Sequence, residues 1–261
     1  MCEEVFHLGA CGGVALSFDE YQGRGVPSAG LVGVLGRQQL TGQELVTDDV
    51  GAEAVQGAAR RRGTGEGGGG RGAAEGAHVA PSLEAELEEL EMGLFIGIAR
   101  GAKSEARLLV LEHRPPEVSE DAAPQLALVG KGVTIDAGGY NLKSGGIHEM
   151  NYDKAGAAAV IGAMVAIARA GLPLHVVAAC PLAENLLGPD ALRPGEILHA
   201  YDGRTVYVEN ADAEGRLLMA DTLAWLCERE PERVVDLATL TSAANIALGE
   251  PYAALFSNDD A

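Results

Sequence analysis

The chain is poor in cysteine and has no paired cysteine motif. Its cysteines, at positions 2, 11, 180 and 227, are scattered and form no C-x-x-C pair. This usage indicates neither a disulfide framework nor a thiolate zinc site. A reducing compartment suits it best, so we expect a cytoplasmic protein.

Long hydrophobic runs and basic charge are also scarce. The longest apolar run, residues 155–168, is shorter than the roughly 20 residues that a membrane-spanning helix needs. The opening MCEEVFHLGACGG lacks the basic segment of a signal peptide. The chain has 19 Lys and Arg residues and 38 Asp and Glu residues. Its net charge of −19 disfavours sequence-independent binding to DNA and binding to an anionic membrane. We therefore expect no nucleic-acid partner and no membrane partner.

The character of the sequence changes near residue 80. Residues 51–76 are rich in glycine and carry mixed charge, so they cannot bury enough apolar surface to offset their backbone entropy. We interpret residues 1–80 as a divergent, partly disordered N-terminal region that ends in a Gly-rich linker, with VALSFDEYQG and GLVGVLG as possible short strands. Residues 81–261, with a regular apolar pattern, form the main domain.

This main domain alternates predicted strands and helices. The patterning favours helices over residues 83–93, 154–171 and 215–229, and strands over residues 107–113, 125–130, 174–180, 205–209 and 233–239. Such alternation predicts an α/β fold with a mixed, largely parallel sheet and helices on both faces. In these folds ligands gather at the carboxyl ends of the strands.

Charged residues follow two of the predicted strands. Lys131, Asp136, Lys143 and Asp153 lie in GKGVTIDAGGYNLKSGGIHEMNYDKAG, directly after the strand that ends at Gly130. A second group follows residues 205–209 in ENADAEGRL and contains Asp212, Glu214 and Arg216. Because both groups leave one edge of the sheet, we expect the two loops to converge.

The converging carboxylates require cations. Taken singly, Asp153 and Asp212 could merely favour the positive ends of the helices they precede. Together, Asp136, Asp153, Asp212 and Glu214 would repel by about 4 kcal/mol for each pair at 4 Å. Two divalent ions would balance four negative charges, and oxygen ligands suit Mn²⁺, Mg²⁺ or a carboxylate-rich Zn²⁺ pair. The sequence has no H-E-x-x-H, G-x-S-x-G or P-loop motif that would suggest another mechanism.

Five motifs carry a family resemblance. The segments GKGVTIDAGG, Lys143, MNYDKAGAAA, ENADAEGRL and DLATLTSA occur in this order. The sequence from Leu83 to Ala261 thereby resembles the leucyl aminopeptidase (cytosol aminopeptidase) family of two-metal exopeptidases, and the first eighty residues do not. On this resemblance residues 81–261 are an incomplete peptidase catalytic domain.

The resemblance implies a role for each matching residue. Asp136 and Glu214 would bridge two divalent ions, Mn²⁺ or Zn²⁺, with Lys131 and Asp153 completing one metal site and Asp212 the other. Lys143 would stabilise the oxyanion, and Arg216 would hold a bicarbonate ion that acts as general base. The matching substrate-pocket positions are Met150, Asn210, Thr239 and Leu240.

The implied activity is that of a metal-dependent aminopeptidase acting on peptides. The family forms hexamers, so the resemblance also implies a homo-oligomer. Family members continue well beyond the point that matches Ala261. An alternative is therefore open: a non-catalytic, truncated fragment, or a subunit that keeps the metal site without turnover.

Overall fold

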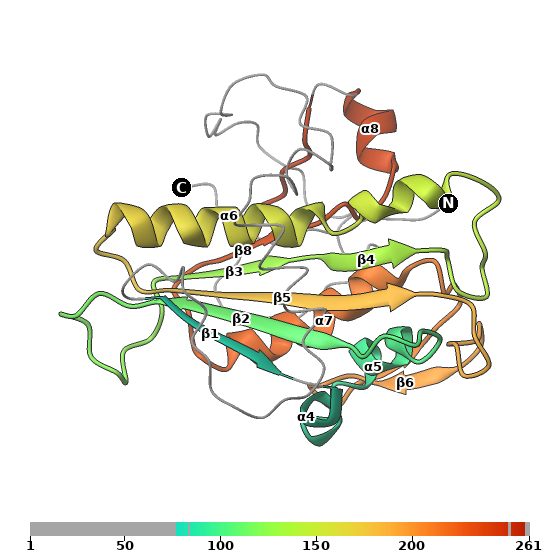
Figure 1. The fold of residues 1–261 in the computed structure, drawn as a ribbon, viewed down its shortest axis with the longest axis horizontal. Helices are drawn as coiled ribbons and strands as arrows, with labels where there is room; N and C mark the ends of the chain where they lie inside the picture. The colour runs from blue at the N-terminus through green and yellow to red at the C-terminus, as the bar shows by residue number, and fades with distance from the viewer. Residues whose placement is uncertain (1–76, 83, 250–251, 259–261) are drawn as a thin grey trace.

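The computed structural model describes residues 77–82, 84–249 and 252–258, and one mixed sheet lies at their centre (Figure 1). The predicted linker and the two short strands upstream of residue 77 lie outside this part of the chain, and the proposed boundary near residue 80 stays a prediction. Within the described residues, no helix is long and apolar enough to cross a membrane.

Six strands of the described chain form the central sheet. In space their order is β1-β2-β5-β3-β8, and β4 also pairs with β5. β1 pairs antiparallel with β2, and β2 with β5, whereas the pairs β5–β3, β3–β8 and β5–β4 are parallel. The predicted mixed, largely parallel sheet is confirmed. The bounds are β1 Ala77–Ser82, β2 Arg107–His113, β3 Leu126–Gly130, β4 Gly132–Asp136, β5 Val176–Asn185 and β8 Val234–Leu237.

Helices cover both faces of the sheet, as the sequence predicted. Helix α6, Ala155–Ala170, packs on one face, and α5, Gly93–Ala99, lies with α7, Glu214–Cys227, on the other (Figure 1). Side chains of successive strand residues alternate between two cores: Leu108 packs on the α5 and α7 side and Leu109 on the α6 side. The smaller elements are α4 Glu84–Glu89, the 3₁₀ helix η1 Ile147–Tyr152, β6 Ile197–His199, β7 Thr205–Tyr207 and α8 Ala243–Leu248.

Three local predictions need correction. The strand expected at residues 205–209 is β7, which pairs with β6 in a separate two-stranded sheet. Its residues are exposed or half-buried, so it lacks the apolar faces that a strand inside the main sheet needs. The helix expected at residues 83–93 is the shorter α4, because the chain turns at Glu91, where φ is 56°, and the sequence did not predict α5, which begins at Gly93. Residues 132–136, expected in a Gly-rich loop, form β4.

The long strand β5 sets the position of the loops that follow its neighbours. Residues 126–129 of β3 pair with its first half, and β4 pairs with its last residues along the same edge. Lys131 lies at the junction of β3 and β4, where its N–H donates to the Leu237 carbonyl and its carbonyl accepts the Ala157 N–H. Close packing at this junction requires glycine, because a Cβ at Gly130 would lie 2.7 Å from Ala157 Cα.

A buried aspartate joins the helices on one face. Asp221 of α7 accepts hydrogen bonds from the backbone N–H groups of Leu94 and Phe95, at 2.9 and 3.0 Å, and from that of Tyr201 at 2.9 Å. Met92, the residue before α5, offers no side-chain cap, so Asp221 caps this helix from another element. Burial raises the pKa of Asp221 to about 6, although the three N–H donors favour the charged form. At neutral pH the group is still a carboxylate.

We expect the Asp221→Ala variant to lower the free energy of unfolding by about 3 kcal/mol, because it leaves three N–H groups at this tertiary cap without their acceptor. Urea denaturation measures the change. The matched control is Asp190→Ala at an exposed position, which should stay within about 0.5 kcal/mol of the parent. A loss below about 1 kcal/mol for Asp221→Ala would contradict this role.

Candidate metal centre

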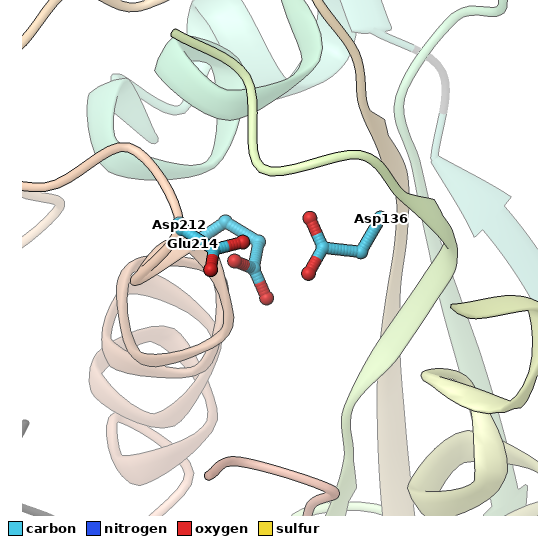
Figure 2. A group of neighbouring side chains, drawn as sticks. All are labelled: Asp136, Asp212 and Glu214. Atoms are coloured by element: carbon cyan, nitrogen blue, oxygen red, sulfur yellow. The ribbon is translucent and has the colours of Figure 1, made fainter. Parts of the chain in front are cut away.

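Four carboxylates come to the carboxyl ends of the central strands. Asp136 is the last residue of β4, Asp153 lies between η1 and α6, and Asp212 and Glu214 lie at the start of α7. One oxygen from each of Asp136, Asp212 and Glu214 lies within 4.8 Å of the others, a spacing that could hold a metal ion. Figure 2 shows the Asp136 carboxylate facing those of Asp212 and Glu214. The two acidic loops therefore converge as expected.

The fourth carboxylate is joined to this group through Lys131. The Lys131 Nζ lies 2.7 Å from Oδ1 of Asp153, the fourth carboxylate, and 2.9 Å from Glu214 Oε1. It also donates to the carbonyl of Thr239 at 3.0 Å. Thr239 Oγ1 also donates to Asp153 Oδ1 at 2.7 Å. The Lys131 side chain is only 2% exposed. The amine thus connects the start of α6 to the start of α7 in a site closed to solvent.

Lys143 bridges the other two carboxylates. Its Nζ lies 2.7 Å from Asp136 Oδ2 and 2.6 Å from Asp212 Oδ1. With 20% of its side chain exposed, Lys143 remains within reach of a ligand from solvent, unlike Lys131. The two lysines therefore have the same type of partner in different environments.

The cluster is short of positive charge. Four carboxylates and two ammonium groups sum to −2. Burial raises the pKa of Glu214 to about 7, and it also raises the pKa of Asp153 and of Asp212, even though a lysine contacts each of them. Burial by itself would lower the pKa of both lysines. Their carboxylate partners have the larger effect, so the pKa of each lysine is raised overall. Carboxyl groups whose pKa stays raised beside two ammonium groups indicate a site that can accept further positive charge.

The donor set fits divalent metal ions. Asp153 Oδ2 is buried and has no hydrogen-bond partner, so one oxygen lone pair of the cluster is unused. Oxygens of the other three carboxylates lie within 4.8 Å of one another, and oxygen donors are what Mn²⁺ and Mg²⁺ prefer. His148, which follows Lys143 by five residues in the sequence, has an 84% exposed side chain, so it points away from the buried part of the cluster.

The expected substrate-pocket residues lie at different places. Thr239 contacts Lys131 and Asp153, and the Leu240 side chain packs beside Gly215, next to the cluster. The Asn210 side chain instead makes a local hydrogen bond, in which its Oδ1 accepts the Asp212 N–H at 2.8 Å. Met150 lies half-buried in η1. The exposed Arg216 lies in the first turn of α7.

Two residues at the cluster were not predicted from the sequence. Asn185, the last residue of β5, hydrogen-bonds Asp136. Gly215 of α7 packs so closely on Lys131 that a Cβ there would lie 2.5 Å from Lys131 Cε. The sequence predicted that the strand corresponding to β5 ends at Cys180, which would place Asn185 in a loop. The polar pair Glu184 and Asn185 after an apolar strand was the available signal.

The amino-acid sequence matches a known family over most of its length. The family model described as "Cytosol aminopeptidase family, catalytic domain" matches residues 66–261. The cytosol aminopeptidase of Vibrio cholerae serotype O1 is 47% identical over 176 residues, which cover 67% of this chain and 35% of that protein. A probable cytosol aminopeptidase of Halorhodospira halophila is 49% identical over 175 residues, which cover 67% and 34%. The chain thus spans about a third of the length of these curated relatives.

Solved structures share the fold. The bottromycin maturation enzyme BotP in complex with Mn has a TM-score of 0.64 and 37% identity, over 80% of this chain and 44% of that chain. A leucine aminopeptidase of Caenorhabditis elegans has a TM-score of 0.63 and 28% identity, over 80% and 39%.

We expect Gly215→Ala to lower the free energy of unfolding by about 2 kcal/mol or more, because the new methyl group displaces Lys131 from its buried carboxylates. The control is Gly162→Ala on the exposed surface of α6, where a Cβ meets nothing within 4 Å. Helix propensity alone should make that control more stable by about 0.5 to 1 kcal/mol. Chemical denaturation of both variants separates the effects, and equal stabilisation of the two would refute the contact with Lys131.

Proposed function

Because the chain belongs to the cytosol aminopeptidase family, we propose that it forms part of a metal-dependent aminopeptidase, which releases N-terminal residues from peptides. The observation that carries this proposal is the convergence of Asp136, Asp212 and Glu214, with Asp153 held beside them through Lys131. A related enzyme solved with Mn supports the choice of cofactor. The names of the curated relatives support a cytoplasmic location.

The cluster has enough donors for two metal ions. In the proposed arrangement Asp136 and Glu214 would be ligands shared by both ions, Lys131 and Asp153 would hold one ion, and Asp212 would hold the other. Two divalent ions, Mn²⁺ or Zn²⁺, would lower the pKa of a bound water from 15.7 to about 7 and polarise the scissile carbonyl. Lys131 would act as a neutral amine, since an ammonium has no lone pair to donate.

Lys143 has the properties of an electrostatic catalyst. The raised pKa keeps its ammonium charged at neutral pH, and its partial exposure leaves it accessible to substrate. Such a group attracts the negative charge that develops on the substrate oxygen, an effect worth about 3 kcal/mol for a single donor.

Arg216 is the proposed anion-binding residue. It is exposed in the first turn of α7, two residues after Glu214. The planar guanidinium matches a carbonate-type anion with two parallel hydrogen bonds. We assign it the binding of bicarbonate as general base, which agrees with the lack of a buried histidine in the described cluster. Met150, Asn210, Thr239 and Leu240 are the proposed contacts for the substrate.

One observation favours an alternative function. Ile246, Leu248, Tyr252 and Leu255, in α8 and the segment after it, are exposed by 47 to 83%. Exposed apolar side chains in one segment suit a contact with further protein, either a second copy of the chain, in the hexamer that the family suggests, or the remainder of a longer protein. If the chain needs that contact for turnover, alone it would bind metal without catalysis.

The test is hydrolysis of leucine p-nitroanilide by the purified chain with added Mn²⁺. We expect about two Mn²⁺ per chain after dialysis, turnover that a chelator abolishes, and no turnover of the N-acetylated anilide, which lacks a free amine. Because the metal binds the native state, a hundredfold excess over Kd should also stabilise the fold by about 2.7 kcal/mol. Two ions without turnover would support the non-catalytic alternative, and a maximum of one ion would refute the dinuclear centre.

We expect the two lysines to respond differently to substitution. Lys131→Ala should weaken one of the two metal sites and lose activity with it, whereas Lys143→Ala should keep both ions and lose about 10²- to 10³-fold in kcat. Lys131→Arg should not restore binding, because a guanidinium is not deprotonated in proteins. Metal content and kcat are measured side by side.

The control for both is Lys103→Ala, which changes an exposed lysine. It should leave metal content and kcat unchanged. Unaltered binding of both ions by Lys131→Ala, or normal turnover by Lys143→Ala, would show that the role given to that lysine is wrong.

A further inference from the structure

Asn185 lies behind the metal cluster and belongs to none of the motifs. It ends β5 directly opposite Asp136 in the pairing of β4 with β5, and it is 3% exposed. A buried amide needs hydrogen-bond partners, because leaving its donors unpaired costs about 1 to 3 kcal/mol. Two of the hydrogen-bond partners of Asn185 are carboxylates of the cluster, Asp136 and Glu214.

The amide group of Asn185 faces three acceptors. Its Nδ2 donates to Asp136 Oδ1 at 2.8 Å and to the Ala211 carbonyl at 3.0 Å, and lies 3.4 Å from Glu214 Oε2. Because all three neighbours are acceptors, the NH₂ side of the amide must face them. Two hydrogens serve three acceptors, so the two short bonds are full and the longer one to Glu214 is shared.

In Asp136 and in Glu214, the Asn185 amide and a lysine contact different oxygens of the carboxylate. Oδ1 of Asp136 accepts from Asn185 and from the Gly138 N–H at 2.9 Å, whereas Oδ2 faces the ammonium of Lys143. Oε2 of Glu214 faces Asn185, whereas Oε1 faces Lys131. In both cases the amide contacts the oxygen that is turned away from the lysine.

We propose that Asn185 is a positioning residue of the metal centre, which holds Asp136 and Glu214 so that one oxygen of each stays directed at cations. The inference rests on the proposed function. An amide suits this place because it donates to carboxylates without adding charge. An aspartate would make the cluster more negative, and a lysine would compete with the metal for the same oxygens.

A purely structural role predicts different behaviour, and the chain offers a control for it. Asn185 also holds the loop before α7 through the Ala211 carbonyl, and Asn141 holds the same residue from the other side, where its Oδ1 accepts the Ala211 N–H at 2.8 Å. If Asn185 serves only to fasten this loop, then Asn141→Ala should mimic Asn185→Ala. If it orients the carboxylates, only the Asn185 variants should affect metal.

The experiment is calorimetric titration of the full chain with Mn²⁺ alone, together with the visible absorption spectrum of the Co²⁺-loaded protein. We expect Asn185→Ala to weaken Mn²⁺ binding by about 10- to 100-fold and to alter the Co²⁺ bands, as loss of a partner of a metal ligand does. Asn185→Leu keeps the branched shape without the donor and should behave in the same way. Asn141→Ala should remain within about threefold of the parent.

The possible results have separate meanings. Mn²⁺ binding by both Asn185 variants within about threefold of the parent, or an equal loss in Asn141→Ala, would overturn the role of Asn185 and leave the aminopeptidase proposal in place. A parent chain that takes up no Mn²⁺ would overturn the dinuclear centre, and the assignment of Asn185 with it. If Asn185→Leu does not fold, Asn185→Ala against Asn141→Ala decides the question.

Discussion

Repulsion between carboxylates is the constraint around which this structure is arranged. Two such charges about 4 Å apart repel by about 4 kcal/mol at an intermediate dielectric, and here four of them converge. Each lysine offsets part of the cost by bridging carboxylates from different elements: Lys131 joins Asp153 to Glu214, and Lys143 joins Asp136 to Asp212. Burial keeps the pKa of three of these carboxyl groups raised in spite of the lysines, and the neighbouring carboxylates raise it further.

The scaffold reduces this cost in two further ways. Helix α7 begins at Glu214 and α6 begins just after Asp153, so the positive ends of two helix dipoles lie beside carboxylates. Two donors, the Gly138 N–H in the loop after β4 and the Asn185 amide at the end of β5, converge on Asp136. Glycine allows this convergence, because side chains at Gly130 and Gly215 would overlap Ala157 and Lys131.

Differences in burial give similar residues different chemistry. Lys131 and Lys143 contact the same kind of group at nearly the same distances, but one is 2% exposed and the other 20%. A lysine closed to solvent can act only on its immediate neighbours, whereas a lysine at the surface of the cluster can also meet a substrate. This difference is the physical basis for giving the first a role in metal binding and the second a role in catalysis.

The sequence by itself determined the fold class, most strands of the central sheet, the long helices α6 and α7, and the identity of the acidic residues. Those features depend on local periodicity, as in α6, or on contiguous motifs such as ENADAEGRL. It did not predict that residues 205–207 leave the main sheet, that residues 132–136 are a strand, or that Asn185 and Gly215 support the cluster. Asn185 meets Asp136 across 49 residues of sequence, and Gly215 meets Lys131 across a still longer separation. Only the tertiary structure decides such contacts, because they depend on strand pairing and helix packing between distant segments.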